Sequence, residues 1–596
     1  MTAHEALKTY FGYDNFRPLQ EEIIQSVLDG RDTLALMPTG GGKSLCFQVP
    51  TMAMGGLCLV ITPLIALMKD QVENLRRRDI RAAAIYTGMT YEQQKVALDN
   101  CQWGPYHFLY VSPERLESEE FRERLARLPI CLIAVDEAHC ISQWGYDFRP
   151  SYLKIAEIRE VIRGERRKGE EAMRQAVPIL ALTATATPDV VDDIQARLAF
   201  REKNVLRKSF LRQNLSYVVR QSNKKADEIV HILSKVPSSA IVYVRNRQRA
   251  QELAAYLNEK GLSADFYHAG LTSKERAAKQ KAWRAYPHPL PKGKGVTRVM
   301  VSTNAFGMGI DKPDVRMVIH HDLPDTIEAY FQEAGRAGRD EQRAFAVLLY
   351  DPAQDKAKAR KRVSDNYPPK EFVTDVYHKT CDFLGVGAGS GQGHTFMLPI
   401  NDLCRIMHLP ILQTYSALHL LTQAGYICFQ EEQEIQPRVK ILISQREMNE
   451  YGLSEQQYKL LELLMRKYSG IFTDLQYVHF DQLTTPITNS PSPIANRQSL
   501  HDLLVSLAQR HIITYIPHDT ANTLTFTRER QTDIYLPTTI YDNHRQQYIK
   551  KLKAMVEYAD NQLYCRSQLL LSYFGETDAA TCGTCDVCRQ KTKTQC

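Results

Sequence analysis

The 596-residue sequence contains no hydrophobic run long enough to cross a membrane and no recognisable targeting segment. A membrane-spanning helix needs about 18 or more consecutive apolar residues, and none is present. The N-terminal stretch MTAHEALKTYFG resembles neither a secretory signal nor an Arg-rich transit peptide. These absences argue against a membrane-embedded or exported protein, so we expect no membrane partner.

Strong charge of either sign is also missing. The formal net charge is +7, with 44% hydrophobic and 24% charged residues, as in ordinary soluble proteins. This charge indicates a polyanionic partner only weakly. The thirteen cysteines are odd in number and follow no secretory signal, which argues for a reducing cytosol rather than disulfides. The length predicts three or four domains.

The stretch LALMPTGGGKSLCFQ (34–48) is the centre of the prediction. An apolar run stops at Pro38 and is followed by three glycines, whose backbone N–H groups can wrap a phosphate because no Cβ intervenes. Lys43 would reach the β- and γ-phosphates, and the Ser44 hydroxyl would hold Mg²⁺. A glycine-rich turn that binds nothing is the alternative. A second apolar run (130–135) ends at Asp136-Glu137-Ala138-His139, where a Walker B element is expected. Together the two motifs predict an NTPase.

The first part of the chain alternates between short apolar runs and helical stretches. This alternation is typical of a doubly wound parallel sheet, in which ligands bind at the carboxyl ends of the strands. The predicted strands lie within 57–63, 108–116, 131–139 and 178–187.

The motifs FRPLQ, MPTGGGKS, TPLIALMKDQ, SPERL, DEAHCISQWG and TATAT occur in this order. In this they resemble the first motor domain of the RecQ family of superfamily 2 DNA helicases. The resemblance implies that Asp136 and Ser44 bind Mg²⁺ and that Glu137 orients the attacking water. Phosphoryl transfer needs positioning and charge neutralisation more than covalent chemistry, so these roles are chemically reasonable. The implied ATP-binding residues are Tyr13, Arg17 and Gln20 for the adenine, and Thr39, Gly40, Gly41, Gly42, Lys43 and Ser44 for the phosphates.

Directly after DEAH comes an aromatic-rich stretch, SQWGYDFRP (142–150). Aromatic side chains beside an arginine suit stacking on unpaired bases. Burial in the core is the alternative for the aromatic residues, but Gly145 and Pro150 favour a loop. The resemblance implies that this loop couples DNA contact to ATP hydrolysis, with Trp144, Phe148 and Arg149 as the DNA-binding residues.

A second set of strands follows a basic run (201–220) that we interpret as a linker. The stretches 301–315 and 332–340 match motifs V and VI of the family. An NTPase with one P-loop gains rate when a partner domain inserts an arginine against the γ-phosphate. We predict that Arg339 is this finger, with Arg336 alongside and Gln332 at the nucleotide; a solvated helix face is the alternative. The predicted strands lie within 240–244, 264–270, 298–304, 315–323 and 344–350.

The motor pattern stops near Lys361, and two similar stretches follow. The segments 398–444 and 499–530 each read as helices followed by a β-hairpin, which indicates winged-helix organisation. The hairpin tips are predicted at 431–436 and 518–522, where polar residues would grip backbone phosphate. A helical spacer that does not contact nucleic acid is the alternative.

Four cysteines close the chain with the spacing Cys565-x16-Cys582-x2-Cys585-x2-Cys588. Four thiolates at this spacing suit a tetrahedral structural Zn²⁺, although such a cluster could hold an iron–sulfur centre. The preceding CRSQLLLSYFGE resembles the zinc site of RecQ proteins, which favours zinc. In typical members this site follows motif VI closely, whereas here more than 220 residues separate Asp340 from Cys565.

We therefore predict two RecA-like parallel-sheet motor domains, a winged-helix-like α+β insert and a helical-hairpin zinc subdomain. The expected boundaries are 1–205, 206–360, 361–545 and 546–596. The resemblance implies a monomeric, ATP- and Mg²⁺-dependent 3′→5′ DNA helicase of the cytoplasm, associated with the nucleoid if bacterial, with single-stranded-DNA-binding protein as a candidate partner. An RNA helicase and a DNA-binding regulator with a degenerate motor are the alternatives.

Overall fold

The computed structural model describes most of the chain, in two compact units. One unit comprises 1–87, 97–360 and 546–596, and the other comprises 88–96 and 361–545. Described are residues 1–595 except 39, 87–88, 143–148, 168–176, 287–295, 308–311, 432–436, 445, 469, 479, 481–482, 484–496 and 517–521.

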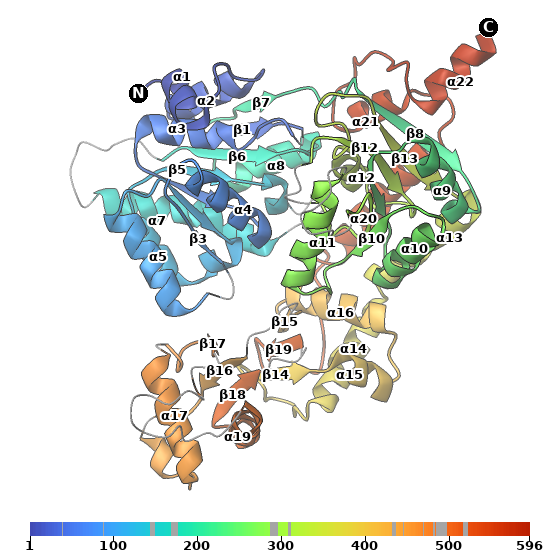
Figure 1. The fold of residues 1–596 in the computed structure, drawn as a ribbon. Coiled ribbons are helices and arrows are strands. Elements are labelled where there is room, and N and C mark those ends of the chain that lie inside the picture. The colour runs from blue at the N-terminus through green and yellow to red at the C-terminus, as the bar shows by residue number, and fades with distance from the viewer. Residues whose placement is uncertain are drawn as a thin grey trace. The chain divides into compact units, whose positions relative to one another are not determined.

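The first motor domain is built on a seven-stranded sheet with the order β3-β4-β2-β5-β6-β1-β7 (Figure 1). All its pairings are parallel, and its central strands are buried because helices cover both faces. The strands are β1 (Thr33–Leu36), β2 (Leu57–Ile61), β3 (Ala82–Ile85), β4 (Phe108–Val111), β5 (Ile130–Val135), β6 (Ile179–Thr183) and β7 (Val205–Arg207). The helices are α1 (Ala3–Ala6), α2 (Gln20–Leu28), α3 (Leu45–Met54), α4 (Ile65–Arg76), α5 (Tyr91–Trp103), α6 (Glu119–Ala126), α7 (Ile155–Arg167) and α8 (Pro188–Arg197).

The order of the strands brings the motifs together. Strands β5, β6 and β1 are neighbours in the sheet, and all three run in the same direction. The DEAH motif follows β5, TATAT begins at the end of β6, and the glycine run follows β1. The Met37 amide donates a hydrogen bond of 3.0 Å to the Thr183 carbonyl, which joins the last two of these ends.

The second motor domain has a six-stranded parallel sheet with the order β10-β11-β9-β12-β13-β8. Our interpretation of 201–220 as a linker was wrong at both ends. β7 pairs with β1 of the first sheet and β8 pairs with β13 of the second, so only 208–214 connects them. The strands are β8 (Leu215–Gln221), β9 (Ser239–Tyr243), β10 (Ala264–Tyr267), β11 (Val299–Ser302), β12 (Val315–His320) and β13 (Ala344–Tyr350). The helices are α9 (Lys225–Lys235), α10 (Arg247–Glu259), α11 (Ser273–Ala285) and α12 (Ile327–Ala334).

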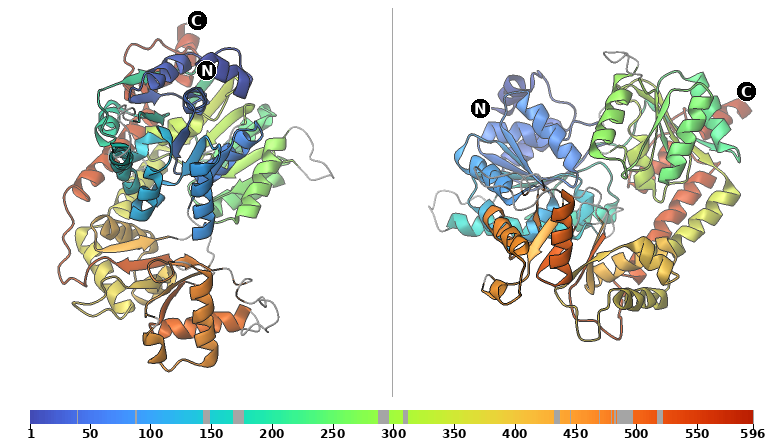
Figure 2. Two further views of the ribbon diagram at one scale, coloured as in Figure 1. Left: turned by 90° about the vertical axis from the view of Figure 1, so that its left-hand side faces the viewer. Right: turned by 60° about the horizontal axis from the view of Figure 1, so that its bottom comes forward.

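The insert consists of two lobes, each with a three-stranded antiparallel sheet (Figure 2). The first lobe has the strand order β14-β19-β15 and the second has β17-β16-β18. The second lobe lies in sequence between β15 and β19 of the first. The first lobe contains α14 (Lys370–Phe383), β14 (Thr395–Leu398), α15 (Ile400–Ile406), α16 (Ile411–Gln423), β15 (Ile427–Gln430) and β19 (Asn522–Phe526). The second contains β16 (Arg438–Ile441), α17 (Glu455–Lys467), β17 (Gln476–Tyr477), α19 (Arg497–Gln509) and β18 (Ile513–Ile516).

The two predicted β-hairpins of the insert were therefore wrong. β15 pairs with β19 instead of β16, and β18 pairs with β16 instead of β19. The apolar faces explain the exchange, because each partner strand completes a separate core. Phe429 is buried in one core with Phe526, whereas Ile441 is buried in the other with Ile513. Most of the predicted tips (432–436 and 518–521) lies outside the described residues.

The helix at the start of the zinc subdomain pairs with a helix that is far from it in sequence. α13 (Pro352–Asn366) follows the second sheet, and α20 (Asp542–Asp560) precedes the first zinc-site cysteine. Lys356 near the start of α13 forms an ion pair of 2.7 Å with Asp560 at the end of α20. The Tyr541 hydroxyl, before α20, donates to the Pro368 carbonyl, after α13, at 2.7 Å. These contacts make α13 and α20 an antiparallel pair whose connection is the insert. Two further helices complete the subdomain, α21 (Arg566–Tyr573) and α22 (Asp586–Gln595).

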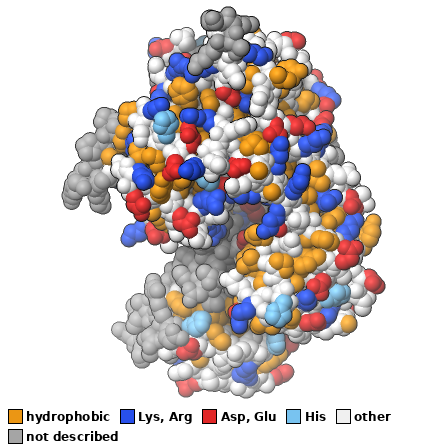
Figure 3. Space-filling model, turned by 90° about the vertical axis from the view of Figure 1, so that its right-hand side faces the viewer, with side chains coloured by type: hydrophobic (Ala, Val, Ile, Leu, Met, Phe, Trp, Pro, Cys, Tyr) orange, Lys and Arg blue, Asp and Glu red, His pale blue; other side chains and the backbone are white. Residues whose placement is uncertain are grey.

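No helix in the described part of the chain is both long enough and apolar enough to span a membrane. On the face drawn in Figure 3, basic and acidic side chains are interspersed, with hydrophobic side chains among them.

Candidate functional site

The glycine run after β1 is tied to the segment that precedes α2. The Gln20 side chain links them, because its Oε1 accepts from the Arg17 amide (2.9 Å) while its Nε2 donates to the Gly42 carbonyl (3.0 Å). Arg17 itself donates to the Gly40 carbonyl at 3.0 Å. Gly42 has φ +81°, a left-handed backbone that favours glycine, and a Cβ there would lie 2.3 Å from Gln20 Nε2 and displace that amide. Gln20 keeps one N–H and one lone pair for the predicted adenine contact.

Lys43 and Ser44 stand at the N-terminal end of α3. This end of the helix carries a partial positive charge, which suits an anion. The Ser44 side chain makes no capping hydrogen bond to the helix, so its hydroxyl remains available for the predicted Mg²⁺. Lys43 Nζ lies 3.9 Å from Glu137 Oε1. The predicted phosphate-binding and water-orienting residues are therefore brought together.

The two acidic residues after β5 differ in their protonation tendencies. Burial and the neighbouring Glu137 carboxylate raise the pKa of Asp136 to about 6, although Lys43 opposes the rise. Burial also acts to raise the pKa of Glu137, but Lys43, His139 and Arg336 outweigh it and lower that pKa. A buried carboxylate whose charge is disfavoured gains from a cation. Asp136 thus fits the predicted role of Mg²⁺ ligand.

His139 and Tyr152 belong to this site although the sequence did not single them out. His139 Nδ1 lies 3.4 Å from Glu137 Oε2 and 2.9 Å from the Thr183 hydroxyl, so it joins the DEAH motif to TATAT. Tyr152 is buried, and its hydroxyl donates to the Asp136 carbonyl at 3.0 Å. The histidine of DEAH was the available signal for the first, and no local signal marks the second.

The arginines of the second motor domain follow α12. Arg336 is buried, donates to the Gly307 carbonyl and lies close enough to Glu137 to lower its pKa. A Cβ on Gly40 would lie 3.4 Å from Arg339 Cγ, so the Arg339 side chain runs beside the glycine run. The structure therefore brings both predicted arginines to the nucleotide motifs. Gln332 is buried on α12.

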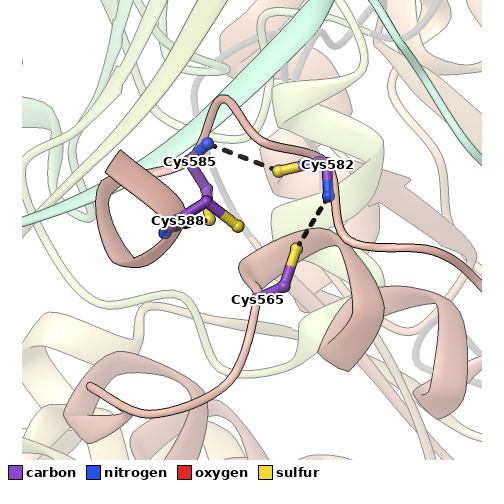
Figure 4. A group of neighbouring side chains, drawn as sticks. All are labelled: Cys565, Cys582, Cys585 and Cys588. Carbon is purple, nitrogen blue, oxygen red and sulfur yellow. Dashed lines mark hydrogen bonds between the residues drawn. The ribbon is translucent and has the colours of Figure 1, made fainter. Parts of the chain in front are cut away.

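The four cysteines at the C-terminal end form one cluster (Figure 4). Their Sγ atoms all lie within 4.8 Å of one another. A zinc ion with Zn–S bonds of about 2.3 Å requires tetrahedral S···S separations of roughly 3.8 Å, so small side-chain adjustments suffice. Backbone N–H groups of Cys582, Cys585 and Cys588 donate to cysteine sulfurs at 3.3–3.4 Å. The Cys585 thiol, the Ser567 hydroxyl and the Thr584 and Cys585 amides lower the pKa of Cys582 to about 3, whereas the Cys582 side chain and burial raise the pKa of Cys585.

The cluster is anchored to the second motor domain. Arg566, next to the first ligand, forms an ion pair of 3.0 Å with Asp586, which also accepts from the Val219 amide of β8 at 3.3 Å. The Phe574 ring lies 5.0 Å from Phe331 of α12, measured between ring centroids. A metal in this cluster would therefore stabilise the packing of the subdomain on the motor.

Three family models match this chain. The DEAD/DEAH box helicase model matches residues 17–194, the helicase conserved C-terminal domain matches 224–341, and RecQ zinc-binding matches 521–589. ATP-dependent DNA helicase RecQ of Haemophilus influenzae is 41% identical over 353 residues, which are 59% of this chain and 54% of that protein. Probable ATP-dependent DNA helicase RecS of Bacillus subtilis is 40% identical over 353 residues, 58% of this chain and 66% of that protein. The chain belongs to the RecQ family.

The expected fold class is confirmed by this membership and by the two parallel sheets. The RecQ zinc-binding match also decides between zinc and an iron–sulfur centre in favour of zinc. The chain spans about half the length of the curated relatives it matches. Among solved structures, Mycobacterium smegmatis helicase Lhr bound to single-stranded DNA and AMP-PNP has a TM-score of 0.45 and 19% identity, covering 70% of this RecQ-family chain and 57% of that one. That similarity is too distant to support an argument.

The predicted DNA-binding residues are only partly described. Trp144 and Phe148, like the predicted phosphate ligand Thr39, lie outside the described residues. Arg149 donates to the Pro63 carbonyl at 3.4 Å and lies 3.8 Å from the Glu114 carboxylate. Tyr13 is exposed, as stacking on an adenine would require.

Proposed function

We propose that this RecQ-family chain is an ATP- and Mg²⁺-dependent DNA helicase that moves 3′→5′ along one strand and splits the duplex ahead of it. The observation that carries the proposal is that side chains of both motor domains meet at the glycine run and the DEAH motif. Lys43 and Glu137 come from one domain, and Arg336 and Arg339 come from the other. A motor whose site needs both domains can couple hydrolysis to their relative movement.

The roles that we assign follow from charge and position. Lys43 and the N-terminal end of α3 bind the phosphates, and Ser44 and Asp136 hold Mg²⁺. Glu137, with its lowered pKa, orients the attacking water. Arg339 stabilises the charge that develops on the γ-phosphate. Tyr13, Arg17, Gln20 and Gln332 complete the nucleotide site.

For the nucleic acid we propose that Trp144, Phe148 and Arg149 contact single-stranded DNA, and that the zinc subdomain has a structural role. Base stacking on an aromatic side chain contributes roughly 1–3 kcal/mol per base, which suits a loop that senses the strand. DNA is named in the names of the helicase homologues. We further propose that the protein acts as a monomer in the cytoplasm and that single-stranded-DNA-binding protein is a partner.

The test is an unwinding assay on 3′-tailed and 5′-tailed duplexes with ATP and Mg²⁺. We expect unwinding of the 3′-tailed duplex only, and no unwinding in the variant Lys43→Ala. In parallel, DNA and RNA oligonucleotides are compared as activators of ATP hydrolysis. Stronger activation by RNA would favour an RNA helicase, and DNA binding without hydrolysis would favour a regulator with a degenerate motor.

A further inference from the structure

The loop that carries the two arginines starts where α12 ends. α12 ends at Ala334, and Gly335 to Gly338 continue as a turn before Arg339. The last carbonyls of a helix have no partner within the helix, and they lie at its negative end. In this chain the Arg336 and Ala337 amides already donate to the Glu333 and Ala334 carbonyls, so the carbonyls that need an outside partner are those of the turn itself, after the helix.

Arg212 supplies that partner from the segment that joins the two motor domains. Its guanidinium donates to the carbonyls of Gly335 (3.3 Å), Ala337 (3.1 Å) and Gly338 (2.7 Å). Gly335 directly precedes Arg336, and Ala337 and Gly338 lie between Arg336 and Arg339. The Arg212 side chain therefore binds the loop on both sides of Arg336 and directly before Arg339. A cation at the C-terminal end of a helix is also favourable electrostatically.

Asn214, two residues after Arg212 in the connecting segment, binds the same loop. Its Nδ2 donates to the carbonyls of Gly338 (2.7 Å) and Gln342 (2.9 Å), and its own carbonyl accepts from the Ala344 amide (2.9 Å). The loop is therefore fixed between Arg212 on its N-terminal side and the start of β13 on its C-terminal side.

The connecting segment is itself held by the zinc subdomain. The Glu576 carboxylate accepts from the Ser209 hydroxyl at 2.7 Å and from the Phe210 amide at 2.8 Å. The Phe210 ring contacts Phe574 of the zinc subdomain (5.2 Å between centroids) and Phe331 of α12 (5.9 Å). Residues from the metal-binding end of the chain thus fix the segment that binds the arginine loop.

We propose that Arg212 is a positioning residue for ATP hydrolysis: it holds the loop so that Arg339 meets the γ-phosphate, with Glu576 fixing the segment that carries it. This inference rests on the proposed function. Arg212 does not touch the nucleotide motifs in the described contacts, so its effect must pass through the arginine loop. A geometric displacement of about 1 Å in a catalytic group can reduce a rate on the order of 10²-fold.

The test compares Arg212→Gln with Arg298→Gln in DNA-stimulated ATP hydrolysis. Arg298 is a matched control because it donates to the carbonyls of Leu233 in the last turn of α9 and of Val236 and Ser238 just after it, far in sequence from the arginine loop. We expect Arg212→Gln to lower kcat at least about tenfold while the Kd of a fluorescent ATP analogue stays near that of the unsubstituted protein. Arg298→Gln should lower the melting temperature but keep kcat. Equal losses of kcat in the two variants would overturn the proposal.

A double variant separates positioning from general stability. If Arg212 acts through Arg339, then Arg212→Gln combined with Arg339→Ala should be no slower than Arg339→Ala alone. Multiplicative losses would overturn the positioning role. Arg212→Lys keeps a positive charge that can still reach one carbonyl, so this variant should recover part of kcat. It also replaces the glutamine variant in the test if that variant does not fold. No recovery of kcat in a folded lysine variant would count against the proposal. Glu576→Ala should lower kcat with zinc content retained. Unsubstituted protein without DNA-stimulated hydrolysis would overturn the proposed function, and this inference with it.

Discussion

Gly338 offers a sharp test of how closely the arginine loop must be placed. Its φ is +62°, and a Cβ there would lie 2.6 Å from Asn214 Nδ2 and 2.9 Å from both Ala344 Cβ and the Gln342 carbonyl. In Gly338→Ala the left-handed backbone should lower the free energy of unfolding by roughly 1–2 kcal/mol, and overpacking by about 1–3 kcal/mol more. The combined loss of about 2–5 kcal/mol can be relieved only by moving the loop that carries Arg339.

Gly261 provides the matched control within the same motor domain. Its φ is +78°, and no atom lies within 4 Å of the position that a Cβ would occupy. Gly261→Ala should therefore lower the free energy of unfolding by only about 1–2 kcal/mol and leave the active site in place.

The assay measures kcat and KM for DNA-stimulated ATP hydrolysis at a temperature where denaturation curves show both variants folded. We expect Gly338→Ala to lose on the order of 10²-fold in kcat, because a displaced finger no longer meets the transition-state charge. Gly261→Ala should keep the kcat of the unsubstituted protein. If the two variants hydrolyse ATP equally fast, the reasoning that the loop must hold one position is wrong.

The remaining predictions concern the phosphate site, the metal and the insert. Lys43→Ala should abolish ATP hydrolysis in a coupled assay while binding of labelled single-stranded DNA is retained, and hydrolysis near the normal rate would contradict this role. Cys582→Ser should lower the folded yield and the zinc content measured by atomic absorption, because the metal's binding energy is partly folding energy; iron in the unsubstituted protein would contradict the zinc assignment. Tyr541 and Pro368 are in contact, so a short flexible linker can replace 369–540 without separating α13 from α20. We expect this variant to keep DNA-stimulated hydrolysis but to lose duplex unwinding. Full unwinding would show that the insert is only a spacer.

The nucleotide motifs could be predicted because their chemistry is local in sequence. Three glycines, Lys43 and Ser44 are consecutive in the sequence. The strand that precedes them, β1, places them at the carboxyl ends of the parallel strands. The same holds for Asp136 and Glu137 after β5. The zinc cluster was also predictable, since three of its four ligands follow one another with two residues between each pair.

Residues whose role depends on distant partners could not be predicted. Tyr152 reaches the Asp136 carbonyl, and Arg212 binds carbonyls more than 120 positions further along the chain. Nothing in their immediate neighbours encodes those contacts. Arg212 also lay in a run that we interpreted as a linker, although strands occupy both ends of that run. A short basic stretch between two sheets can therefore hide a structural arginine.

The insert shows a similar limit for strand pairing. Neighbouring strands in sequence usually pair, so short apolar runs with polar connections were interpreted as two hairpins. The second lobe instead interrupts the hairpin of the first, between Gln430 and Asn522. Only the burial of the apolar faces in two separate cores distinguishes the arrangements, and local sequence does not show which core a strand joins.

The place and charge of the insert together limit what it can do with DNA. It occupies the connection between α13 and α20, which explains why the zinc site is separated from motif VI, since exposed connections tolerate inserted domains. Residues 361–545 contain 16 Lys and Arg against 19 Asp and Glu, which gives a formal charge of −3. Since the whole chain has a formal charge of +7, the residues outside the insert carry +10. Binding to backbone phosphate depends on Lys and Arg and weakens with salt. We therefore expect the dependence of DNA affinity on salt to change little when 369–540 is replaced. A marked loss of salt dependence would show that the insert grips phosphate after all, as its hairpin tips first suggested.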